Sequence, residues 1–191
     1  MTFETVTLPT VYPVEVSDLM AHCRITDSSE QEFLEGVIAS ATDYVQGFTG
    51  LQLIRATYRI RLPQFIDPIR FPQSPLASVT SVQYVDTAGA TQTLSTDYYT
   101  ADTYSNPGQI RRKYGMSWPQ IREQDDAVII EYVAGYGTTK DTVPHLIRHA
   151  VKTIAAHMYE HRDPTITGTI IAKVPSHVDD WLWQYRNVAM G

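Results

Sequence analysis

The first part of the chain combines an extended pattern with a helical one. Residues 1–13 are rich in threonine and valine and are interrupted by two prolines, which disfavours a helix and predicts an extended arm. Ser17 followed by Asp18 suits the start of a helix, because both side chains complement the free N–H groups there. We expect a short helix over 17–24 that buries three side chains: Leu19, Met20 and Cys23.

A longer run of apolar residues at helical spacing follows Ser29, which has Glu32 three residues later in the arrangement of a capping box. The apolar positions of this run are Phe33, Leu34, Val37, Ile38, Ala41, Tyr44, Val45 and Phe48. Gly47 and Gly50 fit its C-terminal end, where glycine is common. The stripe predicts a long amphipathic helix that keeps most of its acidic residues off the apolar side.

The apolar period changes from 3.6 residues to 2 in the middle of the chain. In the segment 55–62, apolar residues alternate with arginine and threonine, as in a strand with one buried face. Residues 78–86 and 91–94 indicate a hairpin that turns near Gly89. Further strands are expected at three places: 97–101, 109–114 and 127–137. The segment 51–137 is therefore predicted to be β-rich.

Helical spacing returns after the β-rich segment. Pro144 suits the first turn of a helix, and a 3.6-residue period follows it at Ile147, Ala150, Val151, Ile154, Ala155 and Met158. Ser176 opens a last short helix with four apolar positions: Val178, Trp181, Leu182 and Tyr185. Neither pair of helices can bury its apolar stripes alone, so we expect the two pairs to pack together.

These patterns together predict an α+β fold in which a β-rich domain is inserted into a four-helix core. We expect an extended arm at 1–13, a helical core formed by 14–50 and 138–191, and an antiparallel β-rich insertion at 51–137. A single cysteine, Cys23, excludes an intramolecular disulfide. No apolar run approaches the roughly 18 residues of a membrane span, so we expect a soluble protein made in the cytoplasm.

The net charge of −6 is concentrated at the front of the chain. Residues 1–50 hold eight acidic residues and one basic residue, which gives −7, whereas 51–137 and 138–191 sum to 0 and +1. A protein that grips DNA through its phosphates needs clustered cations. The composition therefore argues against tight DNA binding by the front segment.

Two clusters are candidates for contacts with a partner. The run Arg111, Arg112 and Lys113 has two interpretations: a contact with DNA or an acidic protein surface, or the protection of a strand edge from aggregation. A second cluster consists of Trp181, Trp183 and Tyr185. A short helix cannot bury both sides of such an aromatic surface within one small subunit, so we expect part of it to meet a neighbour.

One sequence motif, HMYEH, matches the zinc-peptidase pattern H-x-x-E-H. In a zinc peptidase, His157 and His161 would bind the metal and Glu160 would act as general base. A catalytic zinc needs a third protein ligand, and the only later carboxylates are Asp163, Asp179 and Asp180. The alternative is that His161 only packs within the protein. A second pair of histidines, His145 and His149, could likewise bind a metal or simply be solvated. We expect no catalytic, metal-binding or cofactor-binding residues.

The order and spacing of the elements resemble a known family, the head-tail connectors (head-completion adaptors) of tailed bacteriophages, in the subgroup with a β insertion in a helical core. The resemblance covers nearly the whole chain, and its stretches are VEVSDLMAHCRI (14–25), EFLEGVIASATDYVQGFTGLQLIRATYRI (32–60), FPQSPLASVTSVQYVD (71–86), AVIIEYVAGYG (127–137), VPHLIRHAVKTIAAHMYEHRD (143–163) and DDWLWQYR (179–186). Tyr159, Glu160 and Arg162 resemble the Y-E-x-R signature that ends a helix in this family. The signature would make the zinc-like motif a coincidence.

The resemblance implies a structural virion protein and not an enzyme. Such a protein forms a ring, expected to have twelve copies, beneath the portal protein at the head-tail junction, and it meets the next neck or tail protein. Double-stranded DNA passes through the ring without specific binding, and neither a membrane nor a cofactor takes part. The resemblance further implies assembly in the cytoplasm of a bacterial host. Another neck or tail-terminator ring protein is the alternative within the same particle.

The acidic face of the predicted long helix suits a DNA channel. Carboxylates toward the lumen would repel phosphates and keep the DNA sliding. We hypothesise that part of the following set lines the channel, with a solvated helix face as the alternative: Glu30, Glu32, Glu35 and Asp43. Residues 1–13 and 164–176 are predicted to be interaction segments that the portal or the next ring orders.

Overall fold

The computed structural model describes residues 2–161 and 176–187. The chain divides into a helical unit, with residues 10–54 and 137–187, and a β unit, with residues 2–9 and 55–136. Because the helices lie in one unit and the strands in the other, the predicted α+β architecture is confirmed. None of the helices in the described ranges is long and apolar enough to cross a membrane.

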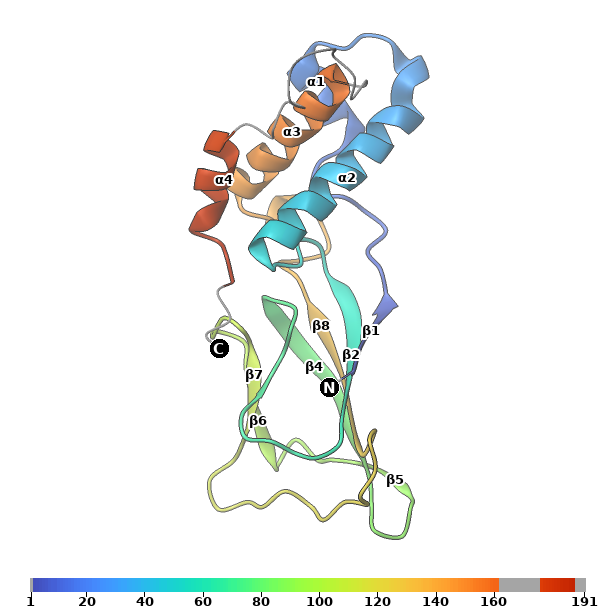
Figure 1. Ribbon diagram of the computed structural model, residues 1–191, viewed down its shortest axis with the longest axis vertical. Helices are drawn as coiled ribbons and strands as arrows, with labels where there is room; N and C mark the ends of the chain where they lie inside the picture. The colour runs from blue at the N-terminus through green and yellow to red at the C-terminus, as the bar shows by residue number, and fades with distance from the viewer. Residues whose placement is uncertain (1, 162–175, 188–191) are drawn as a thin grey trace, which may run out of the picture. The chain divides into compact units, whose positions relative to one another are not determined.

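The helical unit contains four α-helices and two short 3-10 turns among its described residues. Their bounds are Val16–Cys23 (α1), Gln31–Thr49 (α2), His145–Glu160 (α3) and Ser176–Trp183 (α4), with the turns at Ser28–Glu30 and Lys140–Thr142. Helices α2 and α3 lie side by side, and α1 and α4 pack against both of them (Figure 1). Two helices therefore precede the strands between Ala56 and Ala134 and two follow them, as predicted, and of the described strands only Thr2–Thr7 (β1) comes before the first helix.

The core of the helical unit forms where the apolar stripes of α2 and α3 meet. Seven side chains there are at most 1% exposed: Leu34, Ile38, Ala41, Val45, Ile147, Val151 and Ile154. Burying a leucine or isoleucine contributes about 1.5–3 kcal/mol. Three predicted stripe residues stay partly exposed at its edges: Phe33, Tyr44 and Phe48. Thr42 and Thr49 take buried positions instead, because their hydroxyls donate to backbone carbonyls one turn earlier, both at 2.7 Å.

The starts of the first two helices differ from the prediction. Helix α1 follows Glu15, whose backbone N–H donates to the Asp18 carboxylate at 3.3 Å, so Ser17 lies inside the first turn. Before α2, Asp27 accepts a hydrogen bond from the backbone N–H of Ser29 at 2.8 Å and caps a 3-10 turn. The serine caps were therefore wrong, because acidic residues just before them already satisfy the free N–H groups.

Helix α1 also buries less than its pattern predicted. Leu19 is fully buried, but Met20 and Cys23 are only half-buried, since α1 is an outer helix on the α2–α3 pair. Helix α2 ends where expected. Gly50 adopts a φ of 70°, which glycine tolerates, and its N–H donates to the Gln46 carbonyl at 2.8 Å.

The strands of the β unit form two antiparallel sheets among the residues described. The larger sheet has the order β1-β2-β8-β4-β5, with the bounds Thr2–Thr7, Ala56–Leu62, Val128–Ala134, Leu76–Val85 and Thr91–Thr93. The smaller sheet has the order β3-β7-β6, with the bounds Ile69–Arg70, Gln109–Arg112 and Tyr99–Asp102. Strand β2 alternates between buried and half-buried residues, and the β4–β5 hairpin turns at Gly89, as predicted.

The two sheets share one hydrophobic core. Ile60 and Tyr132 of the larger sheet and Ile69 and Ile110 of the smaller one belong to the same cluster and are at most 1% exposed. The ring of Phe71 fills the space between them, with its centroid 4.4 Å from that of Tyr132. Each sheet therefore turns one face to this core and keeps an outer face.

The predicted N-terminal arm is partly a strand. Strand β1 pairs antiparallel with β2 at the edge of the larger sheet. The ring of Phe3 stacks on Tyr58 with 5.1 Å between centroids, and the Glu4 carboxylate lies 3.6 Å from both Arg59 and Arg61. An isolated stretch of extended residues does not reveal its partner strand, which is why the sequence indicated only an arm.

Candidate contact surfaces

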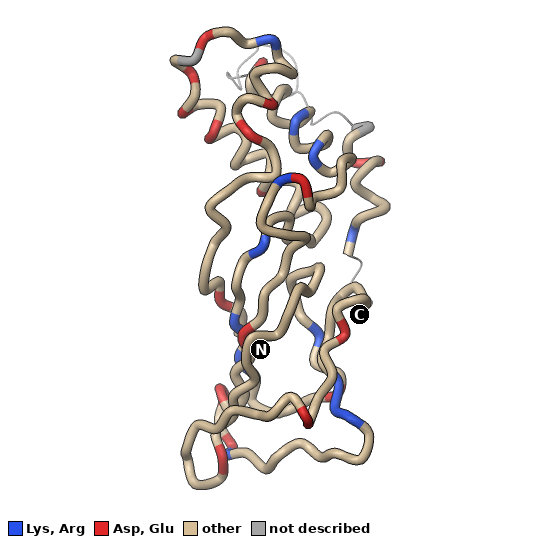
Figure 2. The backbone as a smooth tube through the Cα atoms, turned by 180° about the vertical axis from the view of Figure 1, so that it is seen from behind, with Lys and Arg blue, Asp and Glu red and all other residues tan. Residues whose placement is uncertain are grey.

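Helix α2 turns an acidic face outward. Glu32, Glu35 and Asp43 are exposed on this face, and the exposed or half-buried residues between them are small: Gly36, Ala39 and Ser40. Figure 2 shows the concentration of Asp and Glu along this part of the helical unit. The structure therefore brings three of the four predicted channel residues together on one side of one helix.

Glu30, the fourth residue of that set, has a different environment. It is half-buried, and its carboxylate accepts a hydrogen bond of 2.6 Å from the hydroxyl of Tyr159 on α3. A bond to a charged acceptor is roughly twice as strong as one between neutral groups. Glu30 therefore joins the start of α2 to the end of α3.

The zinc-like motif lies at the end of α3. The rings of His157 and His161 are 4.3 Å apart, and Nδ1 of His161 lies 3.0 Å from the His157 carbonyl oxygen. Asp179, one of the carboxylates considered as a third ligand, accepts a hydrogen bond from the Tyr44 hydroxyl at 3.1 Å. In the part of the chain that the structure describes, no three potential metal ligands lie together.

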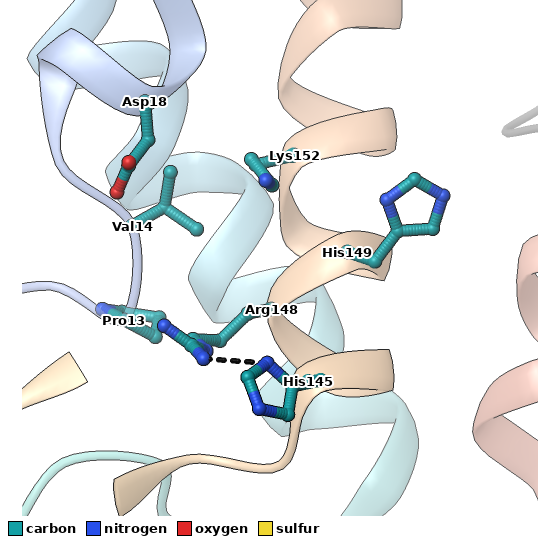
Figure 3. A pocket seen from close by; sticks show the side chains of 7 residues that line it. All are labelled: Pro13, Val14, Asp18, His145, Arg148, His149 and Lys152. Atoms are coloured by element: carbon teal, nitrogen blue, oxygen red, sulfur yellow. Dashed lines mark hydrogen bonds between the residues drawn. The ribbon is translucent and has the colours of Figure 1, made fainter. Parts of the chain in front are cut away.

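A polar pocket of about 130 Å³ lies beside α3 in the helical unit (Figure 3). Its lining consists of Pro13, Val14, Asp18, His145, Arg148, His149 and Lys152. The Arg148 guanidinium donates to Nδ1 of His145 at 2.7 Å and to Asp141 at 3.1 Å, since a guanidinium carries only donors. Lys140 donates to Asp18 at 2.8 Å and holds the pKa of that carboxyl below its usual range. These pairs within the chain favour a structural role for the pocket.

His149 has a different surrounding from His145, four residues earlier. Its side chain points away from the other lining residues in Figure 3, and its ring lies 5.3 Å from Trp181 and 6.2 Å from His22. Burial lowers the pKa of His149, and the positive charge of Lys152 lowers it further. His149 is an exposed residue whose ring contacts Trp181 and His22, and the structure does not present the two histidines as a pair of ligands.

The aromatic cluster of α4 divides by exposure. Trp181 and Tyr185 are half-buried, whereas Trp183 is 53% exposed. The Trp183 ring lies 6.1 Å from Phe48, and the guanidinium of Arg186 lies 4.7 Å from the Trp183 centroid, a cation–π contact. Trp183 is therefore the member of the predicted cluster that has the most surface left for a neighbour.

The predicted run of three cations divides between the two sides of β7. Arg111 lies opposite Thr100, whereas Arg112 lies opposite the buried Tyr99, and successive strand residues point to opposite faces. Nε of Arg112 lies 3.5 Å from Asp67. Only Arg111 and Lys113 of the run thus share one exposed face.

A further cation on that face, Arg70, was not predicted from the sequence pattern. Arg70 of β3 is opposite Gln109, which precedes Arg111 by two residues and so has the same orientation. Arg70 is exposed. A strand of two residues is too short to show a period, so no pattern marks Arg70 as the neighbour of Arg111.

Comparisons with known proteins place the chain among phage connectors. Residues 13–106, about half of the chain, match the family described as phage gp6-like head-tail connector protein. No curated protein matches the sequence.

Solved structures from gene transfer agent (GTA) particles share the fold. A chain from the neck of the empty GTA particle, computed with C6 symmetry, is 24% identical with a TM-score of 0.81. A chain from the virion of the native particle is 23% identical with a TM-score of 0.80, and one from the native neck, computed with C12 symmetry, is 24% identical with a TM-score of 0.74. Each alignment covers 98% of this chain and 96% of the other. The family match confirms the resemblance inferred from the sequence, and the chain belongs to the phage gp6-like head-tail connector family.

Proposed function

We propose that the chain is the subunit of a ring that joins the capsid to the tail of a phage-like particle. The observation that carries this proposal is the match to a family named for head-tail connection, together with a fold shared over 98% of the chain with proteins of the GTA neck. One of those necks was computed with C12 symmetry, which supports a ring of twelve copies. The subunit acts by shape and contact, without catalysis.

The ring lies beneath the portal protein and meets the next neck or tail protein on its other side. It is part of the virion and assembles in the cytoplasm of the bacterial host. The exposed Trp183 is a candidate contact with one of these proteins. Of the two proposed interaction segments, residues 2–7 already pair with the larger sheet, while residues 164–175 lie outside the described residues, as do Arg162 and Asp163.

Part of the acidic face of α2 lines the DNA channel in this proposal. Glu32, Glu35 and Asp43 are exposed on one side of the helix, and no described residue forms an ion pair with them. Carboxylates in that position repel the phosphates of DNA and keep the duplex from sticking to the wall.

Electron microscopy and mass photometry of the purified chain, alone and mixed with portal protein, test the ring. We expect closed rings under at least one of these two conditions. When portal protein is present, the ring should contain close to twelve subunits of this chain. A chain that stays monomeric under both conditions would overturn the proposal.

A further inference from the structure

The smaller sheet of the β unit packs one face into the core, and most residues on its other face are exposed, with Gln109 as a buried exception. Ile69 and Ile110 point into the core and are at most 1% exposed. The register places Arg70 and Arg111 on the opposite face, together with Asp102, whose carboxylate accepts hydrogen bonds from Ser105 and Gln109. Lys113 extends this face by one step, because its N–H donates to the Tyr98 carbonyl at 2.9 Å. We call these residues the basic face: Arg70, Tyr98, Thr100, Arg111 and Lys113.

The cations of the basic face have no acidic partner within the described ranges. None of Arg70, Arg111 and Lys113 forms an ion pair there, although Arg112 beside them pairs with Asp67. Exposed apolar residues lie next to these charges: Tyr98 is 37% exposed, Tyr114 is fully exposed and Met116 is 38% exposed. Tyrosine, methionine and arginine are among the residues that are enriched in protein interfaces. The combination is typical of a contact surface.

A surface of opposite charge lies elsewhere on the same unit. Residues Glu123, Asp125 and Asp126 form an exposed segment that we call the acidic loop, in which Asp126 already pairs with Arg61 at 3.7 Å. The N–H of Arg122 donates to the Val85 carbonyl at 3.0 Å, which fixes the loop at the end of β4, beside the hairpin to β5. Figure 1 places β5 on one flank of the β unit and β6 and β7 on the other. The basic face and the acidic loop are therefore carried on different sides of one compact body.

A ring is closed by heterologous contacts, in which two different surfaces of each subunit meet. We propose that the basic face of one copy packs against the acidic loop of the next copy around the ring. The inference rests on the ring proposed above and names the contact that holds it. Each copy carries both surfaces, so every basic face in a ring has an acidic loop to meet. DNA is a less suitable partner, because the net charge of −6 on the chain repels its phosphates.

Charge reversal on either surface tests the contact. Arg111→Glu/Lys113→Glu makes the basic face acidic, and Glu123→Lys/Asp125→Lys makes the acidic loop basic. Each variant alone presents like charges at every contact, so we expect the concentration needed to form rings to rise by about tenfold or more. An equimolar mixture of the two variants restores opposite charges at every contact if the copies alternate. We expect mass photometry to show rings again in that mixture.

A matched control separates the contact from the effect of net charge. Arg24→Glu/Arg55→Glu changes two exposed cations outside both surfaces and alters the net charge as much as Arg111→Glu/Lys113→Glu does. We expect the control to form rings like the wild type.

Rings that form normally from both variants, or a mixture that is not rescued, would overturn the inference while leaving the ring intact. DNA binding by the wild type that Arg111→Glu/Lys113→Glu abolishes, without a change in ring formation, would assign the basic face to DNA instead. A wild type without rings would remove the proposed function itself.

Discussion

The hydroxyl group of Tyr159 joins the end of α3 to the start of α2, two helices that are distant in sequence. It donates to Glu30 at 2.6 Å, and the pair is half-buried. We expect Tyr159→Phe to lower the free energy of unfolding by about 1–2 kcal/mol, because solvent weakens a bond to a charged group that is not fully buried. Urea denaturation followed by circular dichroism measures this. Tyr104→Phe, in which the replaced ring is 98% exposed, is the control and should change stability by less than about 0.5 kcal/mol. Equal stability of the two variants would contradict the assignment.

Buried tyrosines make the β unit sensitive to alkaline pH. Burial raises the pKa of Tyr58 to about 12 and also raises the pKa of Tyr132. Since the folded-state pKa lies above the unfolded value near 10, the stabilisation is complete below pH 10 and is lost as pH rises toward 12. From Tyr58 alone, we expect the free energy of unfolding to fall by about 1.4 kcal/mol per pH unit in that window.

Denaturation of the wild type and of Tyr58→Phe across this window measures that slope. The variant keeps the ring but not the hydroxyl, so it should lose the part of the pH dependence that Tyr58 contributes. Tyr104→Phe should retain the full slope, because the ring it changes is exposed. A slope that is the same in Tyr58→Phe and the wild type would show that another group causes the alkaline loss.

Among the elements, strand β1 has a protective role that its own sequence does not reveal. It covers the edge of β2, which carries the buried residues Tyr58 and Ile60. Deleting residues 2–7 uncovers the backbone N–H and C=O groups of that edge, and uncovered edges pair with other chains. We expect the deletion variant to scatter light and aggregate at concentrations where Glu4→Ala, which keeps the strand, stays clear. A deletion variant as soluble as Glu4→Ala would show that β2 tolerates an open edge.

The elements differ in how far the sequence predicts them, and length is the reason. Helix α2 and strand β2 repeat their apolar period often enough to identify both the element and its buried face. Strand β3, with two residues, shows no period, and β1 shows no partner. The helix starts were wrong because several neighbouring residues can cap a helix, and only the local backbone decides among Glu15, Ser17 and Asp18.

For the molecule as a whole, the sequence identified charged residues but not their groupings. Composition showed that the acidic excess lies in the first fifty residues, yet the structure separates Glu30, which packs against α3, from the exposed Glu32 and Asp43. Similarly, Arg112 of the run at β7 forms an ion pair with Asp67, and Arg70 of another strand lies on the same face as Arg111. Both differences depend on contacts between segments far apart in the chain, which local patterns cannot contain.

The proposed channel makes a prediction about whole rings and DNA. Glu32→Lys/Glu35→Lys/Asp43→Lys would turn a repelling wall into one that binds phosphates, so preformed rings should retain linear duplex DNA about tenfold or more strongly at low salt. The retention should weaken steeply as salt increases, because each phosphate contact releases counterions. Fluorescence anisotropy with labelled duplex measures it, after mass photometry has shown that the variant still forms rings.

Two controls locate the effect inside the ring. Asp97→Lys/Glu160→Lys/Asp180→Lys reverses three other exposed carboxylates and changes the net charge equally. Closed circular DNA cannot thread a preformed ring, whereas linear DNA can enter by its end. The channel variant should therefore retain linear DNA and not circular DNA, and the control should retain neither. Equal retention of both forms would place the three α2 carboxylates on the outside of the ring, as an ordinary solvated helix face.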